Sequence, residues 1–356
     1  MIKHEYNVIG VMSGTSLDGI DLVFVKFLFD KVWKFEIIST ETVVYDQTWQ
    51  NKLKNLVALS LNELDSIDID YTKYLANVIK RFIEKYNIIE IDAICSHGHT
   101  ALHQPEKKLT YQIGNKPFIV ELIGKTVVCD FRVQDVELGG QGAPLVPIGD
   151  ELLFSEYDYC LNLGGFANIS TKINKNRIAY DICPVNIVLN YYVRKLDFQY
   201  DDKGKIASAG TINNDLLDEL NALAFYKAKH PKSLGIEWVN TVVIPLIDRF
   251  KLQTPDILKT FVEHIAIQLA AEINIKNNTS LYITGGGAYN DYLIERLENY
   301  TKSTIIIPSK TIIEFKEALI FAFLGVLKLR SDINCLQSVT GASMNHSSGK
   351  IYQFLK

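Results

Sequence analysis

The 356-residue sequence has no apolar run of about 18 residues, the length needed to span a membrane. Its first six residues are not followed by the apolar stretch of a secretory signal peptide. Low-complexity tracts and short internal repeats are missing as well. We therefore expect a globular protein of the cytoplasm that does not bind membranes.

No charge sign dominates, and cysteine is scarce. The 37 Lys and Arg against 41 Asp and Glu give a net charge of −4, which gives no reason to expect nucleic acid or an acidic membrane as a partner. The five cysteines are an odd, scattered set, which argues against a disulfide framework. We expect reduced, buried thiols at Cys95, Cys129, Cys160, Cys183 and Cys335.

The common nucleotide-binding loops are absent too. Neither GxxxxGK[ST] nor GxGxxG occurs, which disfavours a Walker-type NTPase and a Rossmann oxidoreductase. Present instead is the segment MSGTSLDGID, residues 12–21, between the apolar runs 6–11 and 22–27. Two strands joined through Gly, Ser, Thr and Asp predict a hairpin with an unusual turn. Its amides and hydroxyls could surround a phosphate group closely.

Apolar periodicity predicts two α/β lobes, because the chain exceeds the size at which one core stops growing. In the first half we expect strands at 7–12, 22–27, 35–45, 91–96 and 126–131, and helices at 46–59, 69–86 and 119–124. A polar, His-rich loop should follow residue 96. The glycine-rich segment 139–144 should be the crossing between lobes.

The second half repeats the opening order of strand, glycine-rich turn and strand at residues 159–173. There we expect strands at 159–163, 168–173, 178–182, 280–284 and 303–308, and helices at 185–196, 216–227, 239–250, 256–275, 291–300 and 315–329. Two lobes that each begin with a phosphate hairpin would enclose a cleft. If both hairpins gripped one polyphosphate, lobe closure would exclude water, as phosphoryl transfer requires.

A series of motifs in fixed order resembles the anhydro-N-acetylmuramic acid kinase family. The motifs lie at residues 10–21, 96–100, 112–114, 130–132, 135, 139–147, 162–169, 231–233, 285–288, 317–318 and 340–342. The resemblance covers nearly the whole chain. It implies an α/β, two-lobed actin/Hsp70/hexokinase-like (ribonuclease H-like) fold with a central interlobe cleft. We expect lobe I at 1–135, with 331–356 packing back on it, and lobe II at 136–330.

The resemblance also implies a reaction. Water opens the 1,6-anhydro ring of anhydro-N-acetylmuramic acid while ATP, with Mg²⁺, phosphorylates O6, giving N-acetylmuramic acid 6-phosphate and ADP in peptidoglycan recycling. The partners would be this sugar and ATP, and a homodimer is an open expectation. A kinase for another anhydro or amino sugar and a nucleotide-switched binding module stay open. The latter should carry a peptide-binding domain after the ATPase, whereas this sequence stops at residue 356.

Asp181 is the candidate catalytic base, because it matches the aspartate of the family's FD-x-GPGN segment. A carboxylate near its reference pKa of ~3.9 can take the proton of a water that attacks C1. The alternative is a strand-end Asp that caps the next helix, whose first turn would hold Pro184. Residues 182–186, ICPVN, lack both family glycines, which leaves substrate selectivity open.

Nucleotide contacts are expected in three glycine-containing segments, with tight turns as the structural alternative. The first hairpin offers Gly14, Thr15, Ser16, Leu17, Asp18, Gly19, Ile20 and Asp21, the second offers Gly164, Gly165 and Asn168, and an adenosine loop offers Gly285, Gly286 and Gly287. A carboxylate among phosphates needs a cation, so Asp18 or Asp21 should face Mg²⁺ directly or through water.

The resemblance assigns the sugar to polar residues of the first half and one glutamate, namely His97, Thr100, Asp130, Arg132, Asp135, Gln141 and Glu317. Arg132 would pair with the lactyl carboxylate. A surface loop at 130–141 and a helix dipole acting on Glu317 are the structural alternatives. Alternation of Cys95, His97, His99 and His103 allows a zinc site, although no further Cys or carboxylate completes it.

Overall fold

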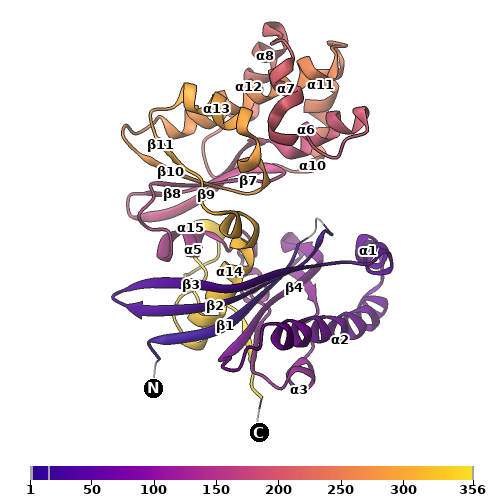
Figure 1. Cartoon of the computed structure of the whole chain (residues 1–356), viewed down its shortest axis with the longest axis vertical. Coiled ribbons are helices and arrows are strands. Elements are labelled where there is room, and N and C mark those ends of the chain that lie inside the picture. Colours follow the sequence, from indigo (N-terminus) through magenta and orange to yellow (C-terminus); the bar gives the residue numbers. More distant parts are fainter. Residues whose placement is uncertain (1–2, 15–16, 355–356) are drawn as a thin grey trace. The chain divides into compact units, whose positions relative to one another are not determined.

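A computed structural model describes residues 3–14 and 17–354, whose contacts divide the chain into two compact units. Unit 1 comprises Met1–Phe154 and Phe315–Lys356, and unit 2 comprises Ser155–Glu314 (Figure 1). This division differs from the boundary expected at residue 135. Residues 136–154 and 315–330 belong to unit 1, so the glycine-rich segment 139–144 is not the crossing.

Among the described residues, seven strands form the sheet of unit 1. They are β1 (Glu5–Ser13), β2 (Gly19–Asp30), β3 (Val32–Val44), β4 (Ala93–Gln104), β5 (Leu109–Ile113), β6 (Val127–Cys129) and β12 (Lys350–Tyr352). The order is β12-β6-β4-β1-β2-β3, with β5 paired to β4. β1, β2 and β3 form an antiparallel meander, whereas β4 runs parallel to β1 and β6 parallel to β4.

Burial along these strands follows their place in the sheet. β1 lies between two neighbours and is buried at nearly every position, as expected for a strand covered on both faces. β3 is the edge strand, and its more buried and more exposed positions largely alternate. The continuous burial of β1 therefore reflects its central position in the sheet, and the alternating burial of β3 reflects its edge position.

In the described part of unit 2, five strands form a sheet of the same topology. They are β7 (Tyr159–Leu163), β8 (Phe166–Ile173), β9 (Asn176–Pro184), β10 (Ser280–Thr284) and β11 (Thr304–Ile306), in the order β11-β10-β7-β8-β9. β7, β8 and β9 form the antiparallel meander, and β10 and β11 add on parallel to β7. Each unit thus starts with a hairpin at the centre of its sheet, which is the predicted ribonuclease H-like arrangement.

The helices of unit 1 cover its sheet. They are α1 (Gln47–Lys54), η1 (Leu56–Ala58), α2 (Leu61–Lys85), η2 (Pro105–Lys107), α3 (Ile119–Ile123), α4 (Val133–Glu137), α5 (Pro147–Leu152), α14 (Lys310–Leu329, which begins in unit 2) and α15 (Gln337–Thr340). Ser60 and Glu63 form a capping box that starts α2. The apolar side of α2 shares one core cluster with β1 and β4 (Figure 1).

α14 packs an aromatic side chain against this sheet. The Phe323 ring lies 5.2 Å from that of Phe27 and 5.0 Å from that of Trp33, centroid to centroid. The helix begins at Lys310, five residues before the expected start. Glu317 is therefore the eighth residue of α14, too far from its first turn for the helix dipole to explain it.

The helices of unit 2 include a long buried one, α12. They are α6 (Asn186–Val193), η3 (Arg194–Leu196), η4 (Asp202–Gly204), α7 (Lys205–Ala209), α8 (Asn214–Asn221), α9 (Ala224–Lys227), α10 (Ile236–Trp238), η5 (Val239–Val243), α11 (Ile244–Asp248), α12 (Thr254–Ile273), η6 (Gly286–Tyr289) and α13 (Asp291–Tyr300). Apolar residues of α12 share a core cluster with β7, β9 and β10.

Two local predictions were wrong. The segment after residue 96 is not a loop, because β4 continues to Gln104 and pairs with β5. Pro184 is not in a helical first turn, because it ends β9, and α6 begins two residues later. None of the described helices is both long enough and apolar enough to cross a membrane. All five cysteines are buried and free, as predicted.

Candidate active site

The turn of the first hairpin joins β1 to β2. Thr15 and Ser16 lie outside the described residues, so their expected phosphate contacts stay predictions. Gly14 accepts a hydrogen bond from the Leu17 amide, N to O 3.4 Å, and Leu17 has a left-handed φ of 62°. Asp18 is exposed on this turn. In the described part of the turn, the backbone is therefore closed by the Leu17–Gly14 hydrogen bond, and the Asp18 carboxylate is exposed to solvent.

Three further residues of this segment lie on β2 and play different parts. A Cβ on Gly19 would lie 2.6 Å from the Val43 carbonyl oxygen, so packing against β3 already requires glycine there. Ile20 has no exposed surface and can offer a ligand only its backbone. Asp21 is partly buried, and its Oδ1 accepts a hydrogen bond of 2.5 Å from the Thr42 hydroxyl. Asp21 is thus the better oriented of the two aspartates.

A buried chain of hydroxyl groups supports the end of β1, and the sequence did not reveal it. The Ser13 hydroxyl lies 2.6 Å from the Tyr45 hydroxyl and 2.8 Å from His99 Nδ1. Tyr45 in turn contacts the Tyr71 hydroxyl. Burial lowers the pKa of His99 to about 4, so its imidazole is neutral at neutral pH. This chain fixes the residue that leads into the phosphate turn.

Arg132 is held by two hydrogen bonds. Its Nε donates to His97 Nε2 at 2.8 Å, and its Nη1 donates to the Gly142 carbonyl at 2.6 Å. His97 Nδ1 lies 2.9 Å from the Gly98 carbonyl, which places the imidazole proton on Nδ1. Burial and the Arg132 charge lower the pKa of His97 well below its ordinary range. Among the described residues Nη2 of Arg132 has no partner, so it is available to a ligand carboxylate.

The other expected sugar ligands lie in the same unit. Asp130 has a left-handed φ of 56°, and its two oxygens contact the Asn115 amide at 3.0 Å and the Lys350 ammonium at 3.1 Å. Thr100 is partly buried on β4. The Gln141 side chain is exposed, while the backbone amide of this residue donates to the Thr340 carbonyl at 2.8 Å.

Asp135 does not fit the expected role as a sugar ligand, because it has no exposed surface. Its Oδ2 accepts from the Gly142 amide at 2.7 Å, and its Oδ1 accepts from the Thr340 hydroxyl at 2.7 Å. Asp135 therefore holds the loop that carries the Arg132 partner Gly142. Its contribution to a sugar site would be positional.

Glu317 is exposed on α14 and lies in the electrostatic field of two expected site residues. The protein atoms around it and the Asp21 carboxylate raise its pKa above the ordinary range, and the Arg132 cation opposes this rise. The three charged groups therefore influence one another within unit 1.

The zinc alternative on β4 is not supported. Both ring nitrogens of His97 are already used, Nδ1 by the Gly98 carbonyl and Nε2 by Arg132, so this imidazole offers no lone pair to a metal ion. Of the described residues that could hold a metal ion together, no group includes Cys95 or any of these histidines.

In unit 2 the turn of the second hairpin is hydrogen-bonded to the start of α6. Gly164 and Gly165 connect β7 and β8, as predicted. Their carbonyls accept the amides of Asn186 at 3.3 Å and of Val185 at 2.8 Å. A Cβ on Gly165 would meet nothing closer than 3.8 Å, so space stays open over its backbone. An anion could approach there.

Asp181 lies on β9 opposite Asn168 of β8. Its Oδ2 accepts a hydrogen bond of 2.8 Å from the Leu234 amide, and its own amide donates to the Lys232 carbonyl at 3.1 Å. Burial raises its pKa, although the Leu234 hydrogen bond lowers it. Since α6 has no side-chain cap, the helix-capping alternative for Asp181 is excluded.

The segment that holds Asp181 is itself anchored. The Lys232 ammonium is almost buried and pairs with Glu272 of α12 at 3.0 Å. Tyr180 donates to the same carboxylate at 2.9 Å. Sequence reasoning singled out residues 231–233 only as a motif. The ion pair of Lys232 and Glu272 anchors residues 231–233 next to Leu234, whose amide binds Asp181.

Gly285, Gly286 and Gly287 follow β10 as predicted. A Cβ on Gly285 or Gly287 would collide with Asn162 or Leu163 at 2.6 Å, whereas a Cβ on Gly286 would meet only Asn186 Nδ2, at 3.9 Å. Two of these glycines are therefore required by packing against β7. Gly286 alone leaves space above its backbone.

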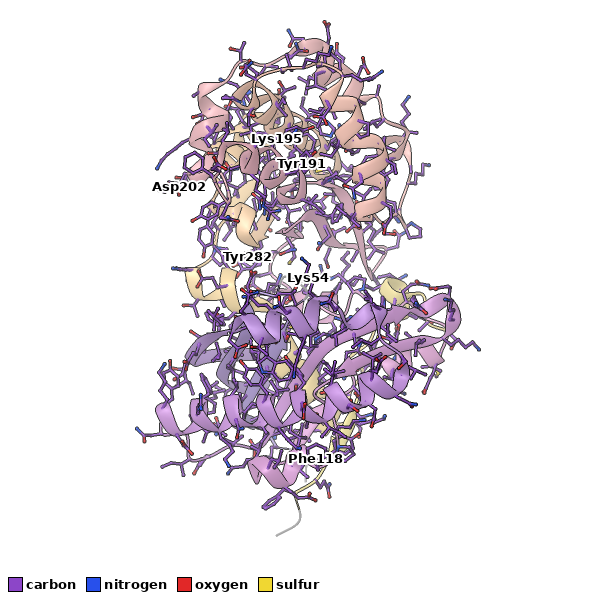
Figure 2. All side chains as sticks on the ribbon, turned by 90° about the vertical axis from the view of Figure 1, so that its right-hand side faces the viewer. Lys54, Phe118, Tyr191, Lys195, Asp202 and Tyr282 are labelled. Carbon is purple, nitrogen blue, oxygen red and sulfur yellow. The ribbon has the colours of Figure 1, made fainter. Side chains whose placement is uncertain are left out.

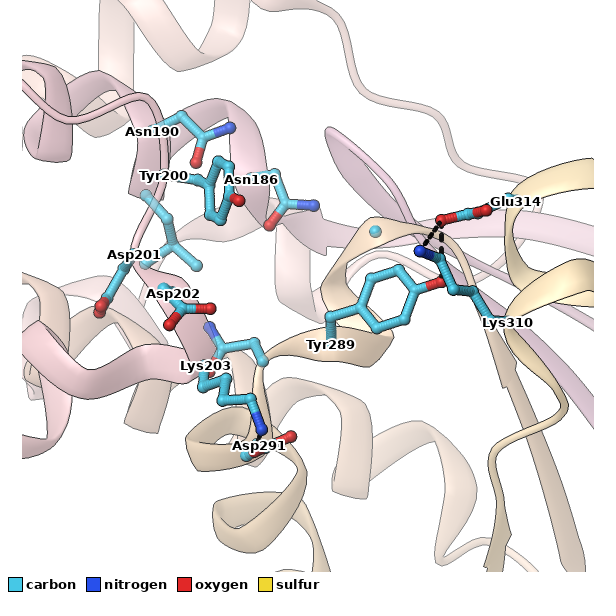
Figure 3. Close-up of a pocket in the computed structure, with 13 residues that line it drawn as sticks. Asn186, Asn190, Tyr200, Asp201, Asp202, Lys203, Tyr289, Asp291, Lys310 and Glu314 are labelled. Carbon is cyan, nitrogen blue, oxygen red and sulfur yellow. Dashed lines mark hydrogen bonds and ion pairs between the residues drawn. The ribbon is translucent and has the colours of Figure 1, made fainter. Parts of the chain in front are cut away.

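That space belongs to a pocket of about 570 Å³ within unit 2 (Figure 3). Its lining is Asn186, Leu189, Asn190, Tyr200, Asp201, Asp202, Lys203, Gly286, Tyr289, Asn290, Asp291, Lys310 and Glu314. The Tyr289 hydroxyl contacts Glu314 at 3.4 Å, and Glu314 also pairs with Lys310 at 3.5 Å. Asp202 is exposed at the edge of the unit (Figure 2). The volume suits a nucleoside, and its aromatic rings and amides suit a flat base.

Solved structures similar to this chain include sugar kinases. Xylulose kinase from Lactobacillus acidophilus aligns over 92% of this chain and 90% of its own, at 14% identity and a TM-score of 0.47. The activator of 2-hydroxyisocaproyl-CoA dehydratase from Clostridium difficile aligns over 91% and 96%, at 13% identity and a TM-score of 0.46.

Curated relatives match at full length. The anhydro-N-acetylmuramic acid kinase of Sulfurimonas denitrificans is 34% identical over 367 residues, which are 97% of this chain and 99% of the relative. That of Coxiella burnetii is 34% identical over 376 residues, covering 99% and 98%. The family model described as anhydro-N-acetylmuramic acid kinase matches residues 6–354. The chain therefore belongs to the anhydro-N-acetylmuramic acid kinase family.

Proposed function

We propose that the protein uses ATP to phosphorylate O6 of anhydro-N-acetylmuramic acid while water opens its 1,6-anhydro ring. The products would be N-acetylmuramic acid 6-phosphate and ADP, and the reaction would serve the recycling of peptidoglycan in the cytoplasm. The full-length family match supports the kinase activity. The observation that carries the ring opening is Asp181, a partly buried carboxylate with one oxygen fixed by the Leu234 amide.

Asp181 acts as general base in this proposal. It takes one proton from a water whose oxygen bonds to C1, the C1–O6 bond breaks, and O6 takes the γ-phosphoryl group as ADP leaves. Burial raises the pKa of Asp181, and a higher pKa makes its carboxylate a stronger base. The hydrogen bond to Leu234 leaves the other oxygen to point at water.

The nucleotide fits the residues of unit 2. We assign adenosine to the pocket beside Gly286, since its volume of about 570 Å³ lies within the range of small-molecule sites. The Tyr289 ring would contact the base. The second hairpin leaves its backbone open at Gly165, where phosphate oxygens could accept hydrogen bonds. In unit 1, we assign phosphate contacts to Gly14 and its neighbours in the first hairpin.

Mg²⁺ would neutralise the charge of the transferring phosphates when bound. Asp21 fits the ion as a ligand or through water, because it is partly buried, is oriented by Thr42 and feels the charge of Glu317. Two interacting carboxylates favour a cation between or beside them. Asp18 is exposed on the turn and lacks such orientation.

The sugar carboxylate would bind Arg132. His97 and the Gly142 carbonyl hold the guanidinium by Nε and Nη1, which leaves Nη2 to meet the lactyl group of the substrate. Thr100, Asp130, Gln141 and Glu317 would hold hydroxyl groups. Because a muramic acid is distinguished from glucosamine by this lactyl group, Arg132 would set the choice between them.

The segment that departs from the family does not argue for another sugar. Cys183 and Val185 stand where the family has glycines, and both have no exposed surface in the core of unit 2. The substitutions thus change packing behind the site.

The activity is tested with purified protein, ATP, Mg²⁺ and anhydro-N-acetylmuramic acid, by measuring ADP and the mass of the sugar product. We expect one ADP for each 6-phosphosugar. N-Acetylmuramic acid, whose ring is already open, serves as the comparison substrate. Turnover only with the open sugar would reject the coupled ring opening, and turnover with neither would reject the proposed substrate class.

A further inference from the structure

Three metal-binding side chains from distant parts of unit 1 meet in its interior. Asp135 comes from α4, while Cys335 and His346 are joined to each other by a β-bridge near the C-terminus. One ligand atom of each lies within 4.8 Å of the others. Their exposed fractions are 0%, 1% and 6%. A carboxylate, a thiol and an imidazole are the side-chain types that bind zinc.

The imidazole of His346 is oriented as a metal ligand would be. Its Nδ1 lies 3.0 Å from the Met344 carbonyl, which places the proton on Nδ1 and a lone pair on Nε2. This Nε2 is buried and has no hydrogen-bond partner among the described residues. It lies 3.5 Å from Asp135 Oδ1, another acceptor. Asp135 Oδ1 already accepts from the Cys335 thiol and the Thr340 hydroxyl, so the unsatisfied atom is Nε2, which needs a cation or a proton to face this carboxylate.

Charge and one of the distances suit a metal ion. Asp135 Oδ1 is 3.5 Å from His346 Nε2, and ligand atoms around a tetrahedral zinc ion are roughly 3.4–3.6 Å apart. The Cys335 thiol donates a hydrogen bond to Asp135 Oδ1 at 3.0 Å, so on losing its proton to bind the ion its sulfur would move away by about 0.5 Å. A thiolate and a carboxylate would neutralise a divalent ion, so no net charge would stay buried. The Thr340 hydroxyl, 2.7 Å from Oδ1, lies next to the cluster.

We propose that Asp135, Cys335 and His346 form a structural site for a divalent transition-metal ion, with zinc as the occupant. Zinc accepts this mixture of sulfur, nitrogen and oxygen ligands, whereas Mg²⁺ prefers oxygen alone. The second oxygen of Asp135 accepts the Gly142 amide at 2.7 Å, an outer contact of the kind that orients metal-binding carboxylates.

The site would fasten the C-terminal segment to the loop after α4. These segments already share backbone hydrogen bonds, from Gln141 to Thr340 at 2.8 Å and from Ser343 to Leu138 at 3.0 Å. The Gly142 carbonyl also accepts a hydrogen bond from Arg132. A metal ion here would therefore stiffen the loop that supports Arg132, without contacting a molecule bound by this arginine. This role does not depend on which sugar the enzyme uses.

The test is a metal titration of the full-length protein after treatment with a chelator. Co²⁺ should bind with one equivalent per chain and produce a thiolate-to-cobalt charge-transfer band, and one equivalent of Zn²⁺ should abolish the band. Zn²⁺ should also raise the melting temperature. Absence of uptake would overturn the proposal, and so would uptake without the thiolate band, since the ligands would then be carboxylates elsewhere.

Variants identify the ligands. Cys335→Ala and His346→Gln should each lose the charge-transfer band or weaken zinc binding at least tenfold, as measured by competition with a chromophoric chelator. Cys129→Ala removes another buried thiol of the same unit and should leave uptake unchanged. Equal loss in the Cys129 variant, or unchanged uptake in both ligand variants, would overturn the assignment. If a variant does not fold, the cobalt spectrum of the unaltered protein decides.

Discussion

At the scale of single residues, Asp181 carries the most specific chemistry of the proposed reaction. Its carboxylate is fixed on one side by the Leu234 amide and partly withdrawn from water, so its ionised form costs folding energy rather than adding to it. We expect Asp181→Asn to reduce kcat about 10²- to 10⁴-fold, the range of general-base catalysis, and to leave the melting temperature unchanged or higher.

Kinetics and thermal unfolding check this prediction together with nucleotide binding, which should persist. Asp218→Asn is the matched control, because Asp218 is exposed on α8 in the same unit. A variant that lost turnover only because it melted earlier would assign Asp181 to stability. Full activity would remove it as the base.

Arg132 tests substrate recognition at the same scale. Lysine cannot donate to His97, Gly142 and a carboxylate in the same plane, so Arg132→Lys should raise KM for anhydro-N-acetylmuramic acid about 10- to 100-fold, the value of a charge-assisted hydrogen bond. KM for ATP should not change.

The control for Arg132 is a substrate rather than a variant. Anhydro-N-acetylglucosamine lacks the lactyl carboxylate, so the change to lysine should affect its weak turnover little. An equal loss with both sugars would show that Arg132 supports the loop at Gly142 and does not read the carboxylate.

At the scale of elements, the loop after β10 separates packing from binding. Gly286→Ala would meet no protein atom closer than 3.9 Å, so we expect unchanged stability and a higher KM for ATP. Gly287→Ala would place a Cβ 2.6 Å from that of Leu163, and should lower the free energy of unfolding by about 1–3 kcal/mol.

Denaturant unfolding and ATP kinetics on this pair of variants measure the two effects. The pair is matched, since both changes add one methyl group within the same short turn. If Gly286→Ala left ATP kinetics untouched, the nucleoside would not lie over this loop.

Most elements were predictable because their apolar periodicity is local. The errors at element ends came from contacts with distant residues. The sequence predicts that the strand containing residues 91–96 ends at residue 96, because polar residues follow. In the structure β4 continues to Gln104, since these polar residues pair with β5. α14 begins five residues before the predicted start, because Ile312 and Ile313 already belong to its first turn.

At the scale of the whole molecule, each unit contains a buried neutral histidine. Burial lowers the pKa of His99 to about 4 in unit 1 and that of His264 to about 3 in unit 2. Below pH ~6.5 the unfolded chain binds protons at these positions and the folded chain does not. Stability should therefore fall as the pH falls from ~6.5 towards 4.

Denaturant unfolding at pH 6.5 and 5 measures this loss. His99→Gln should remove about 1.6 kcal/mol of it, since the unfolded imidazole goes from half to fully protonated over that interval. His4→Gln, at an exposed position, should leave it unchanged. A pH dependence identical in the His99 variant and the unaltered protein would contradict the buried neutral state.

The repeated sheet topology was also readable from the sequence, since each half opens with strand, glycine turn and strand. The interior network was not. Asp135 was expected at the sugar because it follows Arg132 in a polar run, but it faces Cys335 and Thr340, about 200 positions away along the chain. No local pattern reports such a pairing. Glycines showed the same limit, because Gly19 and Gly287 serve packing where nucleotide contacts were expected.

The central claim is that water opens the anhydro ring while O6 receives phosphate. Turnover of anhydro-N-acetylmuramic acid with ATP in ¹⁸O-labelled water tests it most directly, with mass spectrometry and ¹³C NMR of the 6-phosphosugar. The proposal predicts one ¹⁸O at C1 and none in the phosphate. Product without label at C1, or with label in the phosphate group, would contradict it.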